Sequence, residues 1–266
     1  MPASPRVDAS LLVLSGAGLD AAIAERIVRA LEPHFAVVPA RGGGSSPQSA
    51  TAVMSAAEAI EALDCAGVEQ AHVVGLSFGG VIAQELAIEF PDRVRSLVLG
   101  ATSAGGGLYA PPEPPVRSFL RALGDRPAEE GLWAAVPYLY SAFTRRSHPQ
   151  RIGEDIKRRL ATPVDVAASV RERAAAGSHD AADRLGRINA PTLVVHGEQD
   201  RITPLDNARG LASGIPDVRL LVLPESGHAF PTDCPEVAAE LLSFLLGHSP
   251  ARRAPVTRRT GRAARA

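Results

Sequence analysis

Residues 73–83, Val73-Val74-Gly75-Leu76-Ser77-Phe78-Gly79-Gly80-Val81-Ile82-Ala83, join one apolar run to another through a single serine that stands among small residues. Residues 71–76 show the continuous apolar pattern of a buried strand, and residues 78–90 favour a helix. Ser77 therefore lies at a tight strand-to-helix turn. Gly75 and Gly79 leave room there for the backbone and for close packing of the strand against the helix.

The same alternation of strand and helix recurs along most of the chain. Continuous apolar runs predict six buried strands, at residues 10–14, 35–39, 71–76, 94–99, 191–196 and 218–223. Helical patterns lie between them, at residues 20–31, 49–66, 78–90, 205–213 and 235–247. Such alternation is typical of a mostly parallel sheet flanked by helices on both faces, so we expect an α/β fold.

The alternation fails between residues 105 and 186, where helix-like segments follow one another at residues 115–123, 129–140, 153–160 and 164–176. We predict a helical cap over residues 105–186 and a core made of residues 1–104 and 187–248. An aromatic-rich cap over a core suits an apolar pocket. The candidate pocket residues are Trp133, Tyr138 and Phe143 of the cap and Phe230 of the core, although each of them could instead pack the cap against the core.

Composition limits the classes of partner. A net charge of -1 gives no overall attraction to nucleic acid or to an acidic membrane, so we expect a small-molecule substrate. Cys65 and Cys234 lack the spacing of a disulfide framework or a zinc site. The first residues carry no long apolar segment, which predicts a cytoplasmic protein. The composition leaves the oligomeric state open.

Residues 249–266 hold six arginines, no acidic residue and almost no large apolar side chain. A segment of this composition cannot bury enough apolar surface to offset the entropy of ordering, so we predict a disordered tail. Binding of nucleic acid by this basic tail is the alternative.

A nucleophilic serine needs a histidine base and an acid that orients the base. Asp200 follows the predicted strand at residues 191–196, and His228 follows the strand at residues 218–223. Because parallel strands end at the same edge of a sheet, we expect both side chains near Ser77. Asp206 is the rival acid, although it stands at a predicted helix start, where a carboxylate complements the helix dipole. The N–H of Phe78, at the start of the helix after Ser77, is placed to stabilise an oxyanion.

With its nucleophile, acid and base in the order Ser, Asp, His, the chain resembles the α/β-hydrolase superfamily from residue 11 to residue 247. Three more segments match that family's motifs: RGGGSS at residues 41–46, FPDRV at residues 90–94 and INAPT at residues 188–192. Within the superfamily the chain looks most like the small capped esterases, enol-lactonases and haloperoxidase-like proteins. The resemblance implies an α/β-hydrolase fold with a helical cap.

Two departures from the family pattern matter. The family usually has a His-Gly pair after the first of these strands, with an oxyanion amide on the next residue, whereas this chain has Ser15-Gly16-Ala17-Gly18. The resemblance implies that the N–H of Ala17 is the second oxyanion donor, in a loop that lacks the bracing imidazole. Gly16 and Gly18 would leave the pocket floor open for a bulky acyl group. The chain also begins almost at this strand, so we expect the family's N-terminal hairpin to be missing, through either a trimmed sheet or a start site placed downstream of the true one.

The leading functional prediction is a serine hydrolase that cleaves an ester, thioester or lactone through an acyl-enzyme, with no metal or organic cofactor. A second prediction keeps the triad but assigns a lyase, cyclase or C–C bond hydrolase of a secondary-metabolite pathway, because one scaffold hosts many chemistries. A third is a ligand-binding member without turnover.

Overall fold

The computed structural model describes residues 9–16, 19–38, 51–123, 126–161, 172 and 174–249. Six strands form one sheet in the order β2-β1-β3-β4-β5-β6, and every recorded pair of neighbouring strands is parallel. The strands are β1 (Ser10–Ser15), β2 (Ala36–Val38), β3 (Ala71–Leu76), β4 (Val94–Gly100), β5 (Thr192–Gly197) and β6 (Val218–Leu223). The predicted parallel sheet is confirmed. Residues 1–8, where an N-terminal hairpin would lie, are outside the described residues.

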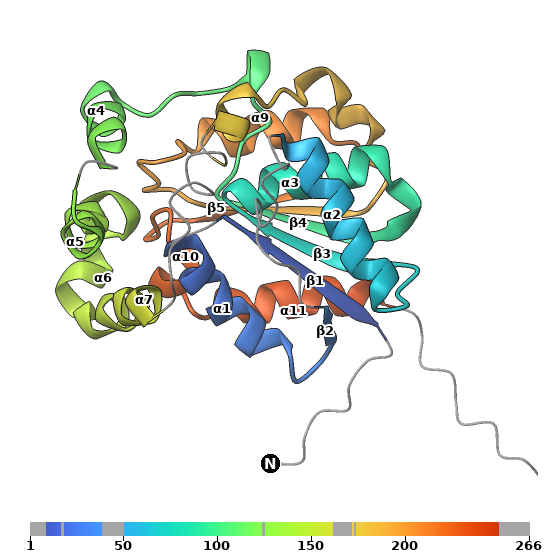
Figure 1. Cartoon of the computed structure of the whole chain (residues 1–266), viewed down its shortest axis with the longest axis horizontal. Coiled ribbons are helices and arrows are strands. Elements are labelled where there is room, and N and C mark those ends of the chain that lie inside the picture. Colours follow the sequence, from blue (N-terminus) through green and yellow to red (C-terminus); the bar gives the residue numbers. More distant parts are fainter. Residues whose placement is uncertain are drawn as a thin grey trace, which may run out of the picture.

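Helices cover both faces of the sheet (Figure 1). One face packs against α1 (Leu19–Leu31) and α11 (Val237–Gly247) through buried residues such as Ile27 and Leu241. The other face packs against α2 (Ala52–Cys65), α3 (Phe78–Glu89) and α9 (Asp206–Gly214). The predicted α/β architecture therefore has its core on both sides of the strands, as continuous apolar strands require.

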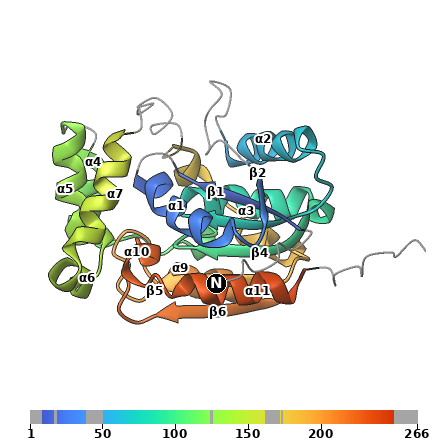
Figure 2. The ribbon, with the colours of Figure 1, turned by 90° about the horizontal axis from the view of Figure 1, so that it is seen from below.

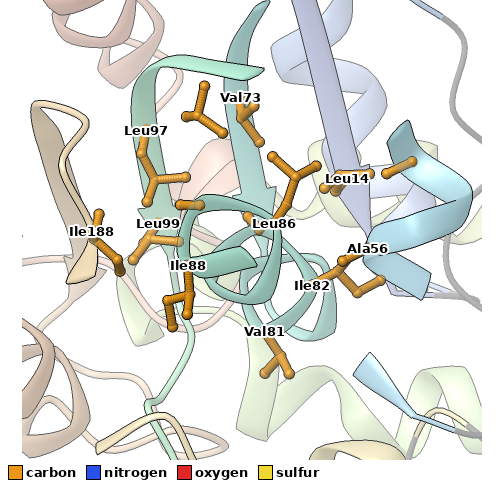
Figure 3. Packing of buried hydrophobic residues seen from close by; sticks show 14 of the residues in the cluster. Leu14, Ala56, Val73, Val81, Ile82, Leu86, Ile88, Leu97, Leu99 and Ile188 are labelled. Carbon is orange, nitrogen blue, oxygen red and sulfur yellow. The ribbon is translucent and has the colours of Figure 1, made fainter. Parts of the chain in front are cut away.

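α3 is the most enclosed of these helices. Every residue from Phe78 to Ile88 is buried, and all of them except Gln84 and Glu85 are apolar or glycine. Figure 3 shows its Ile82 and Leu86 among side chains of three strands, Leu14, Val73 and Leu97. The turn that carries Ser77 is thus held between a central strand and a fully packed helix.

The segment between β4 and β5 departs from the alternation, as predicted. It holds α4 (Pro114–Ala122), α5 (Ala128–Leu139), α6 (Ala142–Ser147) and α7 (Pro149–Ala161), which stand together to one side of the sheet in two views (Figures 1 and 2). We call these four helices the cap helices. Most of the predicted helix at residues 164–176 lies outside the described residues, as do residues 250–266 of the predicted tail.

A buried carboxylate fixes the cap helices to the core. Asp155 on α7 is fully buried, and its Oδ1 accepts a hydrogen bond at 2.7 Å from Nε of Arg26 on α1. Its Oδ2 accepts one at 2.6 Å from Thr232 on the short helix α10 (Phe230–Asp233). The charge-assisted pair with Arg26 lets the carboxylate stay buried.

Among the described helices, none is long and apolar enough to cross a membrane.

Candidate active site

The backbone of Ser77 has an unusual conformation. Its φ of 53° and ψ of -120° lie outside the regions that ordinary residues prefer. Two hydrogen bonds hold it there: the N–H of Ser77 donates to Gly100 O at 2.8 Å, and Ser77 O accepts from the Gly80 N–H at 3.0 Å. Such a strained turn between a strand and a helix presents the hydroxyl at the edge of the sheet.

Close packing explains the glycines on both sides of Ser77. A Cβ on Gly75 would lie 2.6 Å from the carbonyl oxygen of Gly79, and one on Gly79 would overlap the backbone of Leu14 on β1. The backbone of α3 therefore lies directly against two strands. Side chains at these positions would push the helix, and Ser77 with it, away from the sheet.

The three predicted triad residues lie together. Gly197 at the end of β5 pairs with Leu223 at the end of β6, so the loops that follow both strands leave the sheet at the same edge. Nδ1 of His228 is 2.8 Å from Oδ2 of Asp200, and its Nε2 is 3.2 Å from Oγ of Ser77. Asp200 and His228 are buried and Ser77 is partly exposed, and the order Ser77, His228, Asp200 is that of a nucleophile, a base and an orienting acid.

Asp200 is held as a carboxylate by the loop around it. Its Oδ1 accepts from the backbone N–H groups of Ile202 and Thr203, both at 2.8 Å. Burial alone would raise its pKa, but the charge of His228 and hydrogen bonds from His196 and His228 outweigh burial and lower the pKa to about 2. The rival acid Asp206 is exposed at the start of α9 and pairs with Arg209 instead.

His228 lies between two carboxyl groups. Burial would lower the pKa of His228, but the charge of Asp200, its hydrogen bond and the charge of Asp20 together raise the pKa to about 9. The residue before it is also fixed, because the Gly227 N–H donates to Oδ2 of Asp233 at 2.7 Å. The orientation of His228 is therefore set both by the hydrogen bond of its ring to Asp200 and by the hydrogen bond of the preceding backbone N–H to Asp233.

The predicted oxyanion donors are described only in part. Phe78 begins α3 directly after Ser77 and is buried. Gly16, at the end of β1, is its neighbour: a Cβ on Gly16 would lie 3.4 Å from Cβ of Phe78. Ala17 and Gly18 lie outside the described residues, so their predicted roles stay predictions.

A small pocket adjoins Ser77, with a cavity volume of about 10 Å³, close to the room that one water molecule needs. Its described walls are Asp20, Ile23, Leu76, Ser77, Ala101, His228, Phe230 and Pro231.

Phe230, one of the four aromatic residues predicted to line the pocket, is on this wall. The other three aromatic residues and Gly16 are not among its described walls. Trp133 is 51% exposed on α5, Tyr138 stacks on Phe119 beneath Arg201, and Phe143 packs edge-on against His148.

Sequence reasoning missed Asp20. This residue is in the first turn of α1, and from the sequence it reads only as an acid that complements a helix dipole. In the structure it shares the walls of the small pocket with Ser77 and His228, and burial raises the pKa of its carboxyl against the opposing effect of His228. Within the described residues, no cluster of three or more His, Cys, Asp or Glu side chains could hold a metal ion.

Comparison with known proteins agrees with this geometry. Residues 11–241 match the model of the Alpha/beta hydrolase family. The chain is 35% identical over 176 residues to a 2-hydroxy-6-oxo-6-phenylhexa-2,4-dienoate hydrolase from Comamonas testosteroni, a match that covers 62% of this chain and 59% of that protein. It is 30% identical over 253 residues to a poly(3-hydroxyalkanoate) depolymerase from Ectopseudomonas oleovorans, covering 88% and 83% of the two chains.

The fold is shared with solved structures. A thermophilic esterase from Thermogutta terrifontis superimposes with a TM-score of 0.74 at 26% identity, over 92% of each chain. These relatives are hydrolases that differ in the bond they cleave. The parallel sheet, the strained serine turn and the family match over residues 11–241 lead to one conclusion: the chain belongs to the α/β-hydrolase family and is an enzyme of that kind.

Proposed function

We propose that this protein is a serine hydrolase that cleaves a small or apolar carboxylic ester, thioester or lactone through an acyl-enzyme. The observation that carries the proposal is the continuous hydrogen-bonded series from Ser77 Oγ through the two ring nitrogens of His228 to Asp200. The 3.2 Å between Ser77 Oγ and His228 Nε2 suits proton transfer from the serine to the imidazole, and the 2.8 Å to Asp200 suits an orienting hydrogen bond.

In this mechanism Nε2 of neutral His228 takes the proton from Ser77 as Oγ attacks the substrate carbonyl carbon. Asp200 stabilises the resulting imidazolium, and the N–H of Phe78 and, as proposed from the family pattern, that of Ala17 donate to the oxyanion. His228 then gives its proton to the leaving oxygen or sulfur. A water molecule, activated by the same imidazole, attacks the acyl-enzyme and releases the carboxylic acid, so no metal or organic cofactor enters any step.

The pocket favours an apolar substrate. Ile23, Leu76, Ala101 and Phe230 supply its described apolar walls, next to the polar groups of Ser77, His228 and Asp20. At about 10 Å³ the described pocket has room for one water molecule beside Ser77. The esterase and the depolymerase among the similar proteins support an ester substrate.

Hydrolysis of 4-nitrophenyl esters of increasing chain length, and of simple lactones, tests this proposal. We expect turnover by the native protein, and a loss of several orders of magnitude in kcat for Ser77→Ala with an unchanged far-UV circular dichroism spectrum. A Ser77→Ala protein that hydrolyses these esters at the native rate would overturn the assignment.

A second candidate is hydrolysis of a C–C bond. It is favoured by the 35% identity to the Comamonas testosteroni enzyme, whose name gives 2-hydroxy-6-oxo-6-phenylhexa-2,4-dienoate as its substrate. The loss of that compound's absorbance, measured beside the ester assays, separates the two candidates. A lyase or cyclase that uses the triad only for proton transfer would form no acyl-enzyme. A non-catalytic member would bind ligands without consuming any of these compounds.

A further inference from the structure

Asp20 is a carboxyl group beside the proposed nucleophile. It shares the walls of the small pocket with Ser77 and His228, and Ser77 Oγ itself lies 3.2 Å from Nε2 of His228. It lies on the side of the loop after β1, because Oδ2 of Asp20 is 3.0 Å from where a Cβ on Gly16 would lie. Gly16 also borders Phe78, so Asp20 lies on the side of the site where the Phe78 N–H would bind an oxyanion.

The single hydroxyl proton of Ser77 cannot serve two acceptors. If Asp20 were a carboxylate, it would compete with Nε2 of His228 for that proton. If Asp20 carries a proton, its O–H is a donor beside Ser77 Oγ, while the Ser77 hydroxyl donates to His228, whose Nδ1–H donates to Asp200. The protonated form therefore adds a donor next to Oγ without drawing the hydroxyl proton away from His228.

The surroundings of Asp20 also favour the protonated form. Burial raises the pKa of the Asp20 carboxyl, and the charge of Asp200 adds to the effect, against the charge of His228. A further buried carboxyl is close, since Oε2 of Glu172 is 3.6 Å from the same Cβ position on Gly16. A proton on Asp20 removes one of the two negative charges beside His228 and so makes the neutral imidazole, the form that acts as a base, easier to reach.

We propose that Asp20 is a further catalytic residue, which carries a proton in the resting site and donates a hydrogen bond first to Ser77 Oγ and then to the carbonyl oxygen of the substrate as that oxygen becomes negative. A neutral carboxyl group next to a developing oxyanion stabilises it, whereas a carboxylate would repel it. No proton leaves Asp20 in this step; only the acceptor of its hydrogen bond changes. The inference rests on the proposed ester hydrolysis.

The test compares Asp20→Asn, which keeps a donor without a titrating group, with Asp20→Ala, which keeps neither. For ester hydrolysis at neutral pH we expect Asp20→Asn to stay within about tenfold of the native kcat and Asp20→Ala to lose about 10²-fold or more, the usual effect of losing one oxyanion donor, with little change in KM. The native pH profile should be bell-shaped because activity falls as Asp20 ionises. Asp20→Asn should lack the alkaline limb and keep the native acid limb, because Asp20 is already uncharged where His228 titrates; an acid limb that moves to lower pH would show that Asp20 is a carboxylate there.

Equal losses in both variants would mean that a carboxylate is required, and no loss in Asp20→Ala would mean that Asp20 is a bystander; either result overturns the inference. An infrared difference spectrum between the native protein and Asp20→Asn at neutral pH gives a readout that needs no turnover. It should contain the C=O stretch of a protonated carboxyl, and a carboxylate band in its place would refute the proposal. Failure of the ester hydrolysis itself would appear separately, as native protein without activity on any ester.

Discussion

Asp233 on α10 accepts the backbone N–H of Gly227 at 2.7 Å and the backbone N–H of Ser141 at 3.0 Å. Gly227 directly precedes His228, and Ser141 caps α6 among the cap helices. One buried carboxyl therefore joins the loop that carries the proposed base to the segment that covers it.

We predict that Asp233→Ala lowers both stability and turnover. Two buried N–H groups would lose their acceptor, at about 1–3 kcal/mol each in the free energy of unfolding, and His228 would lose part of its backbone support. Asp233→Asn keeps one acceptor oxygen, so we expect its stability and its kcat to be intermediate between those of the native protein and those of Asp233→Ala. Urea unfolding and ester hydrolysis measure the effects, and an Asp233→Ala protein with native stability and kcat would contradict the assignment.

Asp200 and Asp206 form a matched pair for testing the orienting acid. Asp200→Asn removes the charge that holds the imidazolium of His228, so we expect kcat to fall by about 10⁴-fold. Asp206→Asn changes only an exposed pair with Arg209 and should leave kcat unchanged. The reverse ranking of the two variants in a kinetic assay would show that Asp206 is the acid.

Gly79 and Gly153 form a matched pair for testing the packing of the Ser77 turn. A Cβ at Gly79 would overlap the backbone of Leu14, whereas one at Gly153 on α7 would meet no atom within 4 Å. We expect Gly79→Ala to destabilise the protein by about 1–3 kcal/mol or more and to reduce activity. Gly153→Ala should be neutral or stabilise by up to about 1 kcal/mol, because alanine favours the helix. Similar melting temperatures for both variants would exclude the close packing described above.

The raised pKa of His228 predicts a pH-dependent contribution to stability. The folded protein binds this proton more tightly than the unfolded chain, since the pKa rises from 6.5 to about 9 on folding. The stabilisation is therefore complete below about pH 6.5 and is lost as the pH rises through about 9. We therefore expect the melting temperature of the native protein, minus that of His228→Gln, to fall between pH 6 and pH 10. If this difference in melting temperature rises with pH, the predicted sign is wrong.

The sequence predicted the sheet, and the proximity of Ser77, Asp200 and His228, well because both depend on local patterns. Six continuous apolar runs were sufficient to predict the strands, and the order of parallel strand ends brought Asp200 and His228 to Ser77. β3 and β6 even have the predicted bounds.

Side chains whose partners are distant in sequence could not be predicted in this way. From the sequence, Asp20 is only an acid in the first turn of a helix, but in the folded chain it lines the same pocket as Ser77. Asp233 accepts a hydrogen bond from Ser141, which is 92 residues away in the sequence. Trp133 is a residue for which the sequence suggested a role too readily. An aromatic side chain in the cap suggested a pocket, but in the structure this side chain is half exposed. Helical periodicity alone does not reveal which face will meet the core.

The most direct test of the central claim, that Ser77 is an activated nucleophile, is intact-mass measurement after treatment with a fluorophosphonate. We predict a single adduct on the native protein and none on Ser77→Ala, because only a serine hydrogen-bonded to His228 is nucleophilic enough to react. An unmodified native protein, or an adduct that persists in Ser77→Ala, would contradict the account.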